Sequence, residues 1–160
     1  MTATSTALKE IFTAGRPLVE QWIGTARTMN EAFMAAWRDG VLDKAWQEFA
    51  ATYPDLYLTY YLRVRGMGDI KIGKTRNLKT RFLIMMTYYS RGADLVACYP
   101  APAHHEKELK DEFQHLRLCG EWFRAGPALL THLQLIGVDT NSFTNELPSP
   151  YVRREILKFQ

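Results

Sequence analysis

The spacing of hydrophobic residues predicts helices in the first fifty positions of the chain. Apolar side chains recur every three or four positions after Pro17, a residue that suits the first turn of a helix. Asn30 is expected to cap a second helix, which Asp39-Gly40 interrupts. The apolar stripe then continues to Tyr53-Pro54, where a proline disfavours further helix. These patterns predict a helical extension over residues 1–54.

A different pattern follows, in which short β-prone runs are separated by helical stretches. Strands are predicted at Leu56–Val64, Ile70–Gly73 and Leu95–Tyr99, and helices at Asn77–Tyr89, Pro102–Leu116 and Pro127–Ile136. Gly120–Phe123 is expected to be an aromatic-rich turn. These elements place one α/β domain of the α+β kind at residues 55–136. A tail at 137–160 is loop-rich, with a possible short helix at Tyr151–Lys158.

Length and composition set outer limits on the class of protein. The chain has 160 residues, of which 47% are hydrophobic, which is enough for one domain with a core. No run approaches the length of a membrane-spanning helix, and the first residues lack the pattern of a secretory signal. Cys98 and Cys119 match no zinc spacing and are expected to be two reduced thiols. We therefore expect a cytoplasmic protein that does not contact a membrane.

Charge is distributed unevenly along the chain. Residues 1–56 carry 5 basic and 7 acidic side chains, whereas residues 57–160 carry 15 and 10, giving net charges of −2 and +5. Seven Lys or Arg side chains fall between Arg63 and Arg81 against one acid, Asp69. They surround a glycine-rich turn that leads into the start of a helix. A basic strand, turn and helix start of this kind favour the binding of nucleic acid.

Three residues are unusual for a purely structural domain, although each has two interpretations. Glu106 lies one turn before Leu109 on the apolar face of its helix. It either binds a metal or a cationic partner, or sits at the rim of the first turn. Arg81 flanks an apolar stripe, where it either binds phosphate or extends to solvent. Tyr60 lies in the middle of a strand, where it either packs or acts on a water.

The order and spacing of these residues resemble the GIY-YIG endonuclease superfamily, and most closely a compact phage and bacterial branch of it. The resemblance covers residues 57–123, under half of the chain. It is carried by Leu58-Thr-Tyr60 as the first motif, Lys71-Ile-Gly73 as the second, the stretch Gly73–Arg81, the acidic helix Glu106–Phe113 and Gly120-Glu-Trp-Phe123.

This resemblance implies a three-stranded antiparallel sheet flanked by helices, and an endonuclease that hydrolyses DNA. It implies one divalent metal, Mg²⁺ or Mn²⁺, held by Glu106, with Arg81 on the scissile phosphate and Tyr60 activating or orienting water. It also implies a bacterial cytoplasm, or the host cytoplasm if a phage encodes the chain. The residues expected to contact the substrate are Lys71, Gly73, Lys74, Arg76 and Lys79.

The chain departs from the family pattern at several positions. Leu58 replaces a glycine of the first motif, and Lys71 replaces the tyrosine of the second. Asn141 and Asn145 match the late asparagine of other branches by position only. Glu121 is either structural or a second acid near the site.

Two other functions therefore stay open. One is a catalytically inactive module of the same fold that binds nucleic acid or a protein through Arg63–Arg81. The other is an interaction protein whose helical extension carries the function. Residues 1–56 are expected to set partner or target choice, either packed on the body or paired with a second copy as a homodimer.

Overall fold

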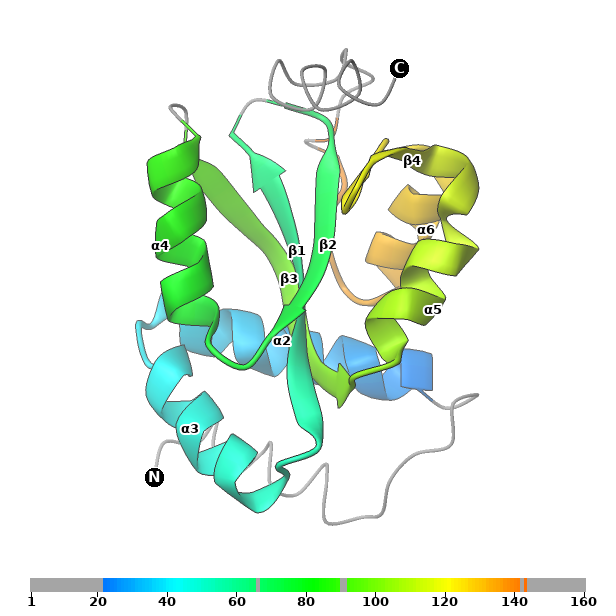
Figure 1. Ribbon diagram of the computed structural model, residues 1–160. Helices are drawn as coiled ribbons and strands as arrows, with labels where there is room; N and C mark the ends of the chain where they lie inside the picture. Colours follow the sequence, from blue (N-terminus) through cyan, green and yellow to red (C-terminus); the bar gives the residue numbers. More distant parts are fainter. Residues whose placement is uncertain (1–21, 66, 90–91, 142, 144–160) are drawn as a thin grey trace.

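A five-stranded antiparallel sheet with helices around it forms the protein (Figure 1). This computed structural model describes residues 22–65, 67–89, 92–141 and 143. The strands are β1 (Leu56–Val64), β2 (Ile70–Thr75), β3 (Ala93–Pro102), β4 (Arg117–Cys119) and β5 (Trp122–Phe123), in the order β3-β1-β2-β5-β4. The helices are α2 (Trp22–Arg38), α3 (Leu42–Thr52), α4 (Leu78–Tyr88), α5 (His105–Glu112), the 3₁₀ turn η2 (Gln114–Leu116) and α6 (Pro127–Leu135).

The α+β class and the antiparallel sheet agree with expectation, but the sheet has two strands more than the three predicted. The predicted turn at Gly120–Phe123 is a small hairpin between β4 and β5, with Gly120 at a φ of 55°. β4 and β5 have only three and two residues, so they show no readable alternation. Pro102 ends β3 instead of opening a helix. β3 is an edge strand, where a proline leaves no ladder hydrogen bond unmade.

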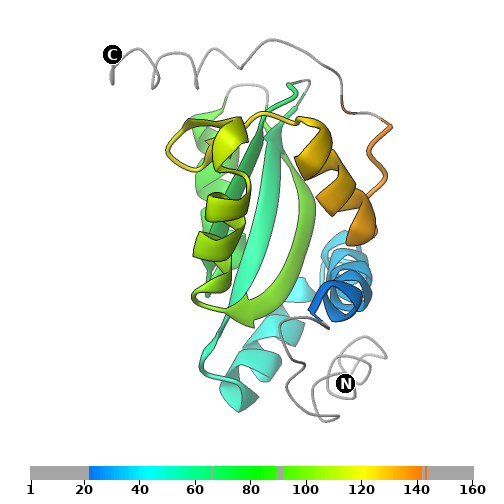
Figure 2. The ribbon, with the colours of Figure 1, turned by 90° about the vertical axis from the view of Figure 1, so that its right-hand side faces the viewer.

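Asn30 is not a helix cap, because α2 continues through it. Its side chain is buried, and its Nδ2 donates to the carbonyl of Ile136 at 2.9 Å. Its Oδ1 accepts from the backbone N–H of Cys98, also at 2.9 Å. A buried amide needs such partners. Asn30 therefore ties α2 to both β3 and the end of α6, which lie beside it in Figure 2.

The N-terminal helices share one hydrophobic core with the sheet. Phe33 of α2 is buried and meets Trp46 and Phe49 of α3 edge-on, with ring centroids 6.4 and 6.1 Å apart. These rings belong to the same cluster as Leu58 and Tyr61 of β1. The prediction that the helices pack on the body is confirmed for α2 and α3. The residues that follow Pro17 up to position 21, and the predicted helix Tyr151–Lys158, lie outside the described residues. None of the helices in the described ranges is long and apolar enough to cross a membrane.

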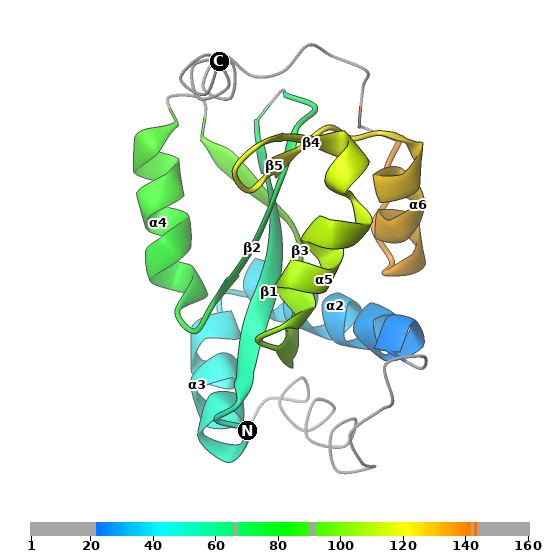
Figure 3. The ribbon, with the colours of Figure 1, turned by 45° about the vertical axis from the view of Figure 1, so that its right-hand side comes forward.

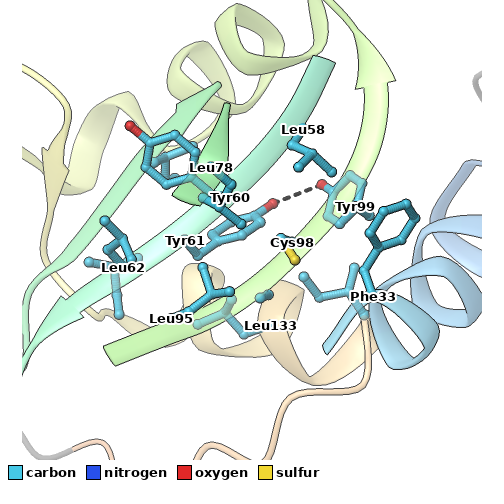
Figure 4. Packing of buried hydrophobic residues seen from close by; sticks show 14 of the residues in the cluster. Phe33, Leu58, Tyr60, Tyr61, Leu62, Leu78, Leu95, Cys98, Tyr99 and Leu133 are labelled. Atoms are coloured by element: carbon cyan, nitrogen blue, oxygen red, sulfur yellow. Dashed lines mark hydrogen bonds between the residues drawn. The ribbon is translucent and has the colours of Figure 1, made fainter. Parts of the chain in front are cut away.

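A chain of four hydrogen-bonded side chains runs through the core on one face of the sheet. The Tyr61 hydroxyl lies 2.9 Å from that of Tyr99 (Figure 4) and 2.7 Å from Nε2 of His132 in α6. The Tyr99 hydroxyl lies 2.8 Å from Nε2 of His105. The pKa of both histidines is lowered to about 4, by burial in His132 and by burial together with the charges of His132 and His104 in His105. Both rings are therefore neutral near pH 7.

Because the pKa values of these histidines are lowered, we expect the protein to lose stability in mild acid. The pKa of each is about 6.5 in the unfolded chain and lower in the folded one, so between these values only the unfolded chain binds the proton. The free energy of unfolding should fall by up to about 1.4 kcal/mol per pH unit for each histidine as the pH drops below 6.5. Urea unfolding at pH 7.5, 6.5 and 5.5 measures this fall. A His105→Asn, His132→Asn double variant should show a shallower pH dependence, while the exposed His115→Asn control keeps the wild-type slope. An unchanged slope in the double variant would contradict the assignment.

Candidate functional site

The hairpin of β1 and β2 brings Tyr60 directly opposite Gly73. The Tyr60 side chain is almost fully buried, with 1% exposed. A Cβ at position 73 would overlap the phenol hydroxyl and lie 3.0 Å from the ring atom Cε1. Only glycine leaves room for Tyr60 to cross β2 at this point. Within the Lys71-Ile-Gly73 motif, Gly73 therefore makes the space that the Tyr60 ring occupies.

Tyr60 and Tyr61 point to opposite sides of β1, as alternation along a strand requires (Figure 4). Tyr61 contacts Tyr99 and His132, so it belongs to the core network. Tyr60 instead lies on the side that faces α4, since Leu58, two residues earlier, lines a pocket with residues of that helix. The prediction that Tyr61 lies on the opposite sheet face from Tyr60 is confirmed.

Charges on three other elements act on the Tyr60 hydroxyl. Burial raises the pKa of Tyr60 to about 12; the negative charges of Glu121 and Glu106 raise it as well, while the positive charge of Arg81 lowers it. The phenol therefore keeps its proton at neutral pH. Arg81 and Glu106 are therefore near enough to Tyr60 for their charges to act on its hydroxyl, although no hydrogen bond or ion pair among the described residues joins the three.

The start of α4 holds Arg81 in its first turn. Asn77 caps the helix, accepting from the backbone N–H of Thr80 at 3.2 Å, and the N–H of Arg81 donates to the Asn77 carbonyl. The Arg81 side chain is exposed, and it makes no hydrogen bond or ion pair with any described residue. A free guanidinium at a helix N-terminus, where backbone N–H groups also point outward, suits the binding of a phosphate.

Glu106 points inward from α5, the first of the two interpretations that its place one turn before Leu109 left open. Its side chain is 13% exposed, and Leu109 and Phe113 on the same helix face are buried. Glu108, by contrast, is 52% exposed. α5 packs on β2, whereas α4 follows β2 in the chain and packs on β3, with the two helices on either side of the sheet strands in Figures 1 and 3.

A chain of four alternating charges extends from β2 to α5. The ammonium of Lys71 lies 2.9 Å from Oε2 of Glu121, and that of Lys110 lies 3.2 Å from Oε1 of the same carboxylate. Lys110 also lies 2.5 Å from Oε1 of Glu106. Burial opposes ionisation of Glu121, but Lys71 and then Lys110 outweigh it and lower the pKa of this carboxyl. Lys110 was not among the residues predicted from the sequence, although its position four residues after Glu106 is a spacing typical of helical ion pairs.

The predicted substrate-binding residues fall into two groups. Lys74 and Lys79 are exposed, and Lys74 donates to the Ala103 carbonyl at 3.1 Å. Arg76 Nη1 donates to the carbonyls of Pro54 and Leu56 at 2.6 and 2.5 Å, which fixes the start of β1. Arg76 therefore has a structural task that the sequence did not indicate.

A pocket of about 290 Å³ lies between α4 and the N-terminal helices. Trp37, Asp43 and Trp46 line it from the helical extension, while Lys79 and Phe82 line it from α4. The helical extension thus adjoins the element that carries Arg81. Trp46 Nε1 also donates to the Arg76 carbonyl at 2.7 Å, just before α4 begins.

Glu106 is the partly buried carboxylate that could hold a metal here, and in the structure it pairs with Lys110. In the described ranges no three His, Cys, Asp or Glu side chains are grouped so that they could hold a metal. One partly buried carboxylate with water and phosphate oxygens is nevertheless a common ligand set for Mg²⁺, which keeps several waters. Asn141 lies in a turn after α6, where its N–H donates to Asp139, and Asn145 lies outside the described residues.

No protein-family model, curated protein or solved structure matches this chain. Function is therefore inferred from the arrangement of the side chains themselves. Tyr60, Arg81 and Glu106 come from β1, α4 and α5; Tyr60 packs over Gly73 of β2, and the charges of the other two act on its hydroxyl.

Proposed function

We propose that the protein is a metal-dependent endonuclease of the GIY-YIG type that hydrolyses phosphodiester bonds in DNA. The observation that supports this most is a buried phenol, packed over Gly73, on which the charges of the exposed Arg81 and the inward Glu106 act. Each has the chemistry that phosphodiester hydrolysis needs. A cytoplasmic location in a bacterium, or in the host of a phage, is part of the same proposal.

Arg81 would bind the scissile phosphate. Its guanidinium is exposed and has no ion-pair partner among the described residues, so no internal bond must break first. Two parallel N–H groups match two phosphate oxygens, and the positive charge opposes the negative charge that grows in the transition state. Lys74 and Lys79, which are also exposed, would bind flanking phosphates and add affinity.

Glu106 would hold the divalent cation, Mg²⁺ or Mn²⁺. When bound, such an ion polarises a phosphate oxygen and makes a coordinated water more acidic. Glu106 is the inward carboxylate closest to this chemistry on α5, because Glu108 faces solvent.

Tyr60 would orient the attacking water through its hydroxyl. With a pKa raised to about 12, the phenol is protonated at neutral pH, so it acts as a hydrogen-bond partner and not as a resting base. Lys71 stands where the family has a second tyrosine, but its ammonium is bound to Glu121. Lys71 therefore holds Glu121 in place in this arrangement.

Tyr60→Phe tests the role of the hydroxyl. We expect the cleavage rate to fall by roughly 10- to 100-fold, because only the group that orients water is removed. The ring still fills the space over Gly73, so the midpoint of thermal unfolding should stay within a few degrees. Single-turnover cleavage and circular dichroism measure the two effects. Tyr57→Phe is the matched control, because it removes a hydroxyl from the same strand and keeps the ring beside Lys74 and Arg76; an equal loss of activity in both variants would contradict the role.

The alternative is a catalytically inactive GIY-YIG-like module that binds nucleic acid or a protein. Two observations favour it: the second phenol is replaced by Lys71, and Glu106 is paired with Lys110. The exposed basic side chains of β2 and α4 would then serve binding only. A homodimer formed through the N-terminal helices is a further prediction, and light scattering over a range of concentrations tests it.

One experiment separates nuclease from binding module. Purified protein is incubated with plasmid, single-stranded DNA and RNA, with Mg²⁺, Mn²⁺ or EDTA, and both binding and cutting are measured. The nuclease proposal predicts DNA cutting that EDTA abolishes. Binding of DNA at every metal concentration without any cut strand would support the inactive module instead.

A further inference from the structure

We infer that Lys110 is a latch on Glu106, which must move to Glu121 before a divalent cation can bind. This inference rests on the proposed function, because it concerns the carboxylate proposed to hold the metal. It assigns a regulatory task to two residues outside the proposed catalytic set. The site would then be closed at low metal concentration by its own ammonium group.

The latch is visible in the contacts of Lys110. Its ammonium lies 2.5 Å from Oε1 of Glu106 and 3.2 Å from Oε1 of Glu121, so it already bridges two carboxylates. The Lys110 side chain is 19% exposed and that of Glu106 is 13% exposed. Because both side chains are mostly buried, solvent screens their charges less than it would at the surface, which strengthens the Lys110–Glu106 pair.

A cation on Glu106 and the ammonium of Lys110 exclude one another. Both would sit within a few ångströms of the same carboxylate, and their positive charges would repel across a poorly hydrated space. Mg²⁺ also keeps a bulky shell of waters, which needs the volume that the ammonium fills. Lys110 must therefore leave Glu106 when a cation arrives.

Glu121 is placed to receive Lys110. It already accepts from Lys110 through Oε1, while Lys71 occupies Oε2, so the two lysines use different oxygens. An ammonium that swings from Glu106 to Glu121 needs only a rotation at the end of its flexible stem. At no stage is the charge of Lys110 left unpaired in a partly buried place, which would be costly. Glu121 thus lowers the free-energy cost of moving Lys110 away from Glu106, and Lys71 keeps Glu121 in position.

The latch predicts opposite effects of changes at its two ends. Lys110→Met should tighten Mn²⁺ binding by about tenfold, because the competing cation is gone while the stem still packs. Glu121→Gln should weaken Mn²⁺ binding by a similar factor, because Lys110 loses its alternative partner and stays on Glu106. Lys107→Met and Glu108→Gln, on the exposed side of α5, are controls that should bind as wild type.

The measurement is Mn²⁺ affinity of the DNA-free protein, by electron paramagnetic resonance of free Mn²⁺ and by calorimetry. Circular dichroism checks the fold of each variant, and Lys110→Arg, which keeps a cation beside Glu106, should not tighten binding. The inference is overturned if Lys110→Met binds Mn²⁺ no more tightly than wild type, or if Glu121→Gln does not weaken binding.

A Glu106→Gln variant separates this failure from that of the proposed function. If Mn²⁺ binding depends on Glu106 but not on Lys110, the metal site is supported and the latch is contradicted. If Glu106→Gln binds as much Mn²⁺ as wild type and Lys110→Met do, both the metal site and the latch are contradicted.

Discussion

Replacing Arg81 with alanine is expected to lower the single-turnover rate of DNA cleavage by about 100-fold or more. The exposed guanidinium is near enough to Tyr60 for its charge to lower the pKa of the phenol, and in the proposed function it binds the phosphate on which charge develops during hydrolysis. It is one of several exposed basic groups near β2 and α4, so DNA affinity should fall only a few-fold. The Arg81 side chain has no partner among the described residues, so stability should be unchanged.

Lys79→Ala is the matched control for Arg81→Ala, because the two residues lie on the same helix two positions apart. It should weaken DNA binding and reduce the slope of the logarithm of affinity against the logarithm of salt concentration by about one. The cleavage rate at saturating DNA should change little. Gel-shift titrations at several salt concentrations and single-turnover kinetics give both numbers. Equal losses of binding and cutting in the two variants would mean that this surface only binds.

Replacing Glu106 with glutamine is expected to remove metal-dependent cleavage almost completely, by at least about 100-fold. A neutral amide is a poor ligand for Mg²⁺, whereas it still accepts a hydrogen bond from Lys110. The variant should therefore fold normally even though the side chain is partly buried. Cleavage of plasmid DNA and thermal unfolding test the two halves of this prediction.

Glu108→Gln is the matched control for Glu106→Gln. It removes the same charge from the same helix, two residues away, on the exposed side. This variant should cut DNA as wild type does. A result in which Glu108→Gln is inactive and Glu106→Gln cuts normally would mean that the wrong face of α5 had been assigned.

The central strands and the site-bearing helices were predictable because their patterns are local. β1 begins and ends where its run of β-prone residues does, and Asn77 caps α4 with its own side chain. The inward position of Glu106 followed from its spacing to Leu109 and Phe113. Alternation along β1 correctly separated Tyr60 from Tyr61.

The remaining features depend on contacts between residues far apart in the chain. Asn30 is of a residue type favoured at helix N-termini, yet its side-chain amide binds the backbone of Cys98 and Ile136, 68 and 106 residues away. The guanidinium of Arg76 looks like a phosphate ligand in the sequence, but it holds two carbonyls at the start of β1. No local pattern encodes such partners.

The charge chain around Glu121 shows the same limit. Lys71, Lys110 and Glu121 come from β2, α5 and the β4–β5 hairpin, and their pairing requires that β5 lies beside β2. β5 has two residues, too few to show a strand pattern. The Lys110–Glu106 pair alone had a local signal, since the two residues are four apart in one helix.

The most direct test of the proposed activity is the metal dependence of strand cleavage after all metal has been removed. Wild-type protein is dialysed against EDTA, freed of chelator and titrated with Mg²⁺ in the presence of supercoiled plasmid, with Glu106→Gln treated in parallel. The account predicts no nicking without metal, saturable recovery of nicking as Mg²⁺ is added to the wild type, and no recovery in Glu106→Gln. Nicking at the same rate in both proteins, or no nicking by the wild type at any Mg²⁺ or Mn²⁺ concentration, would contradict it.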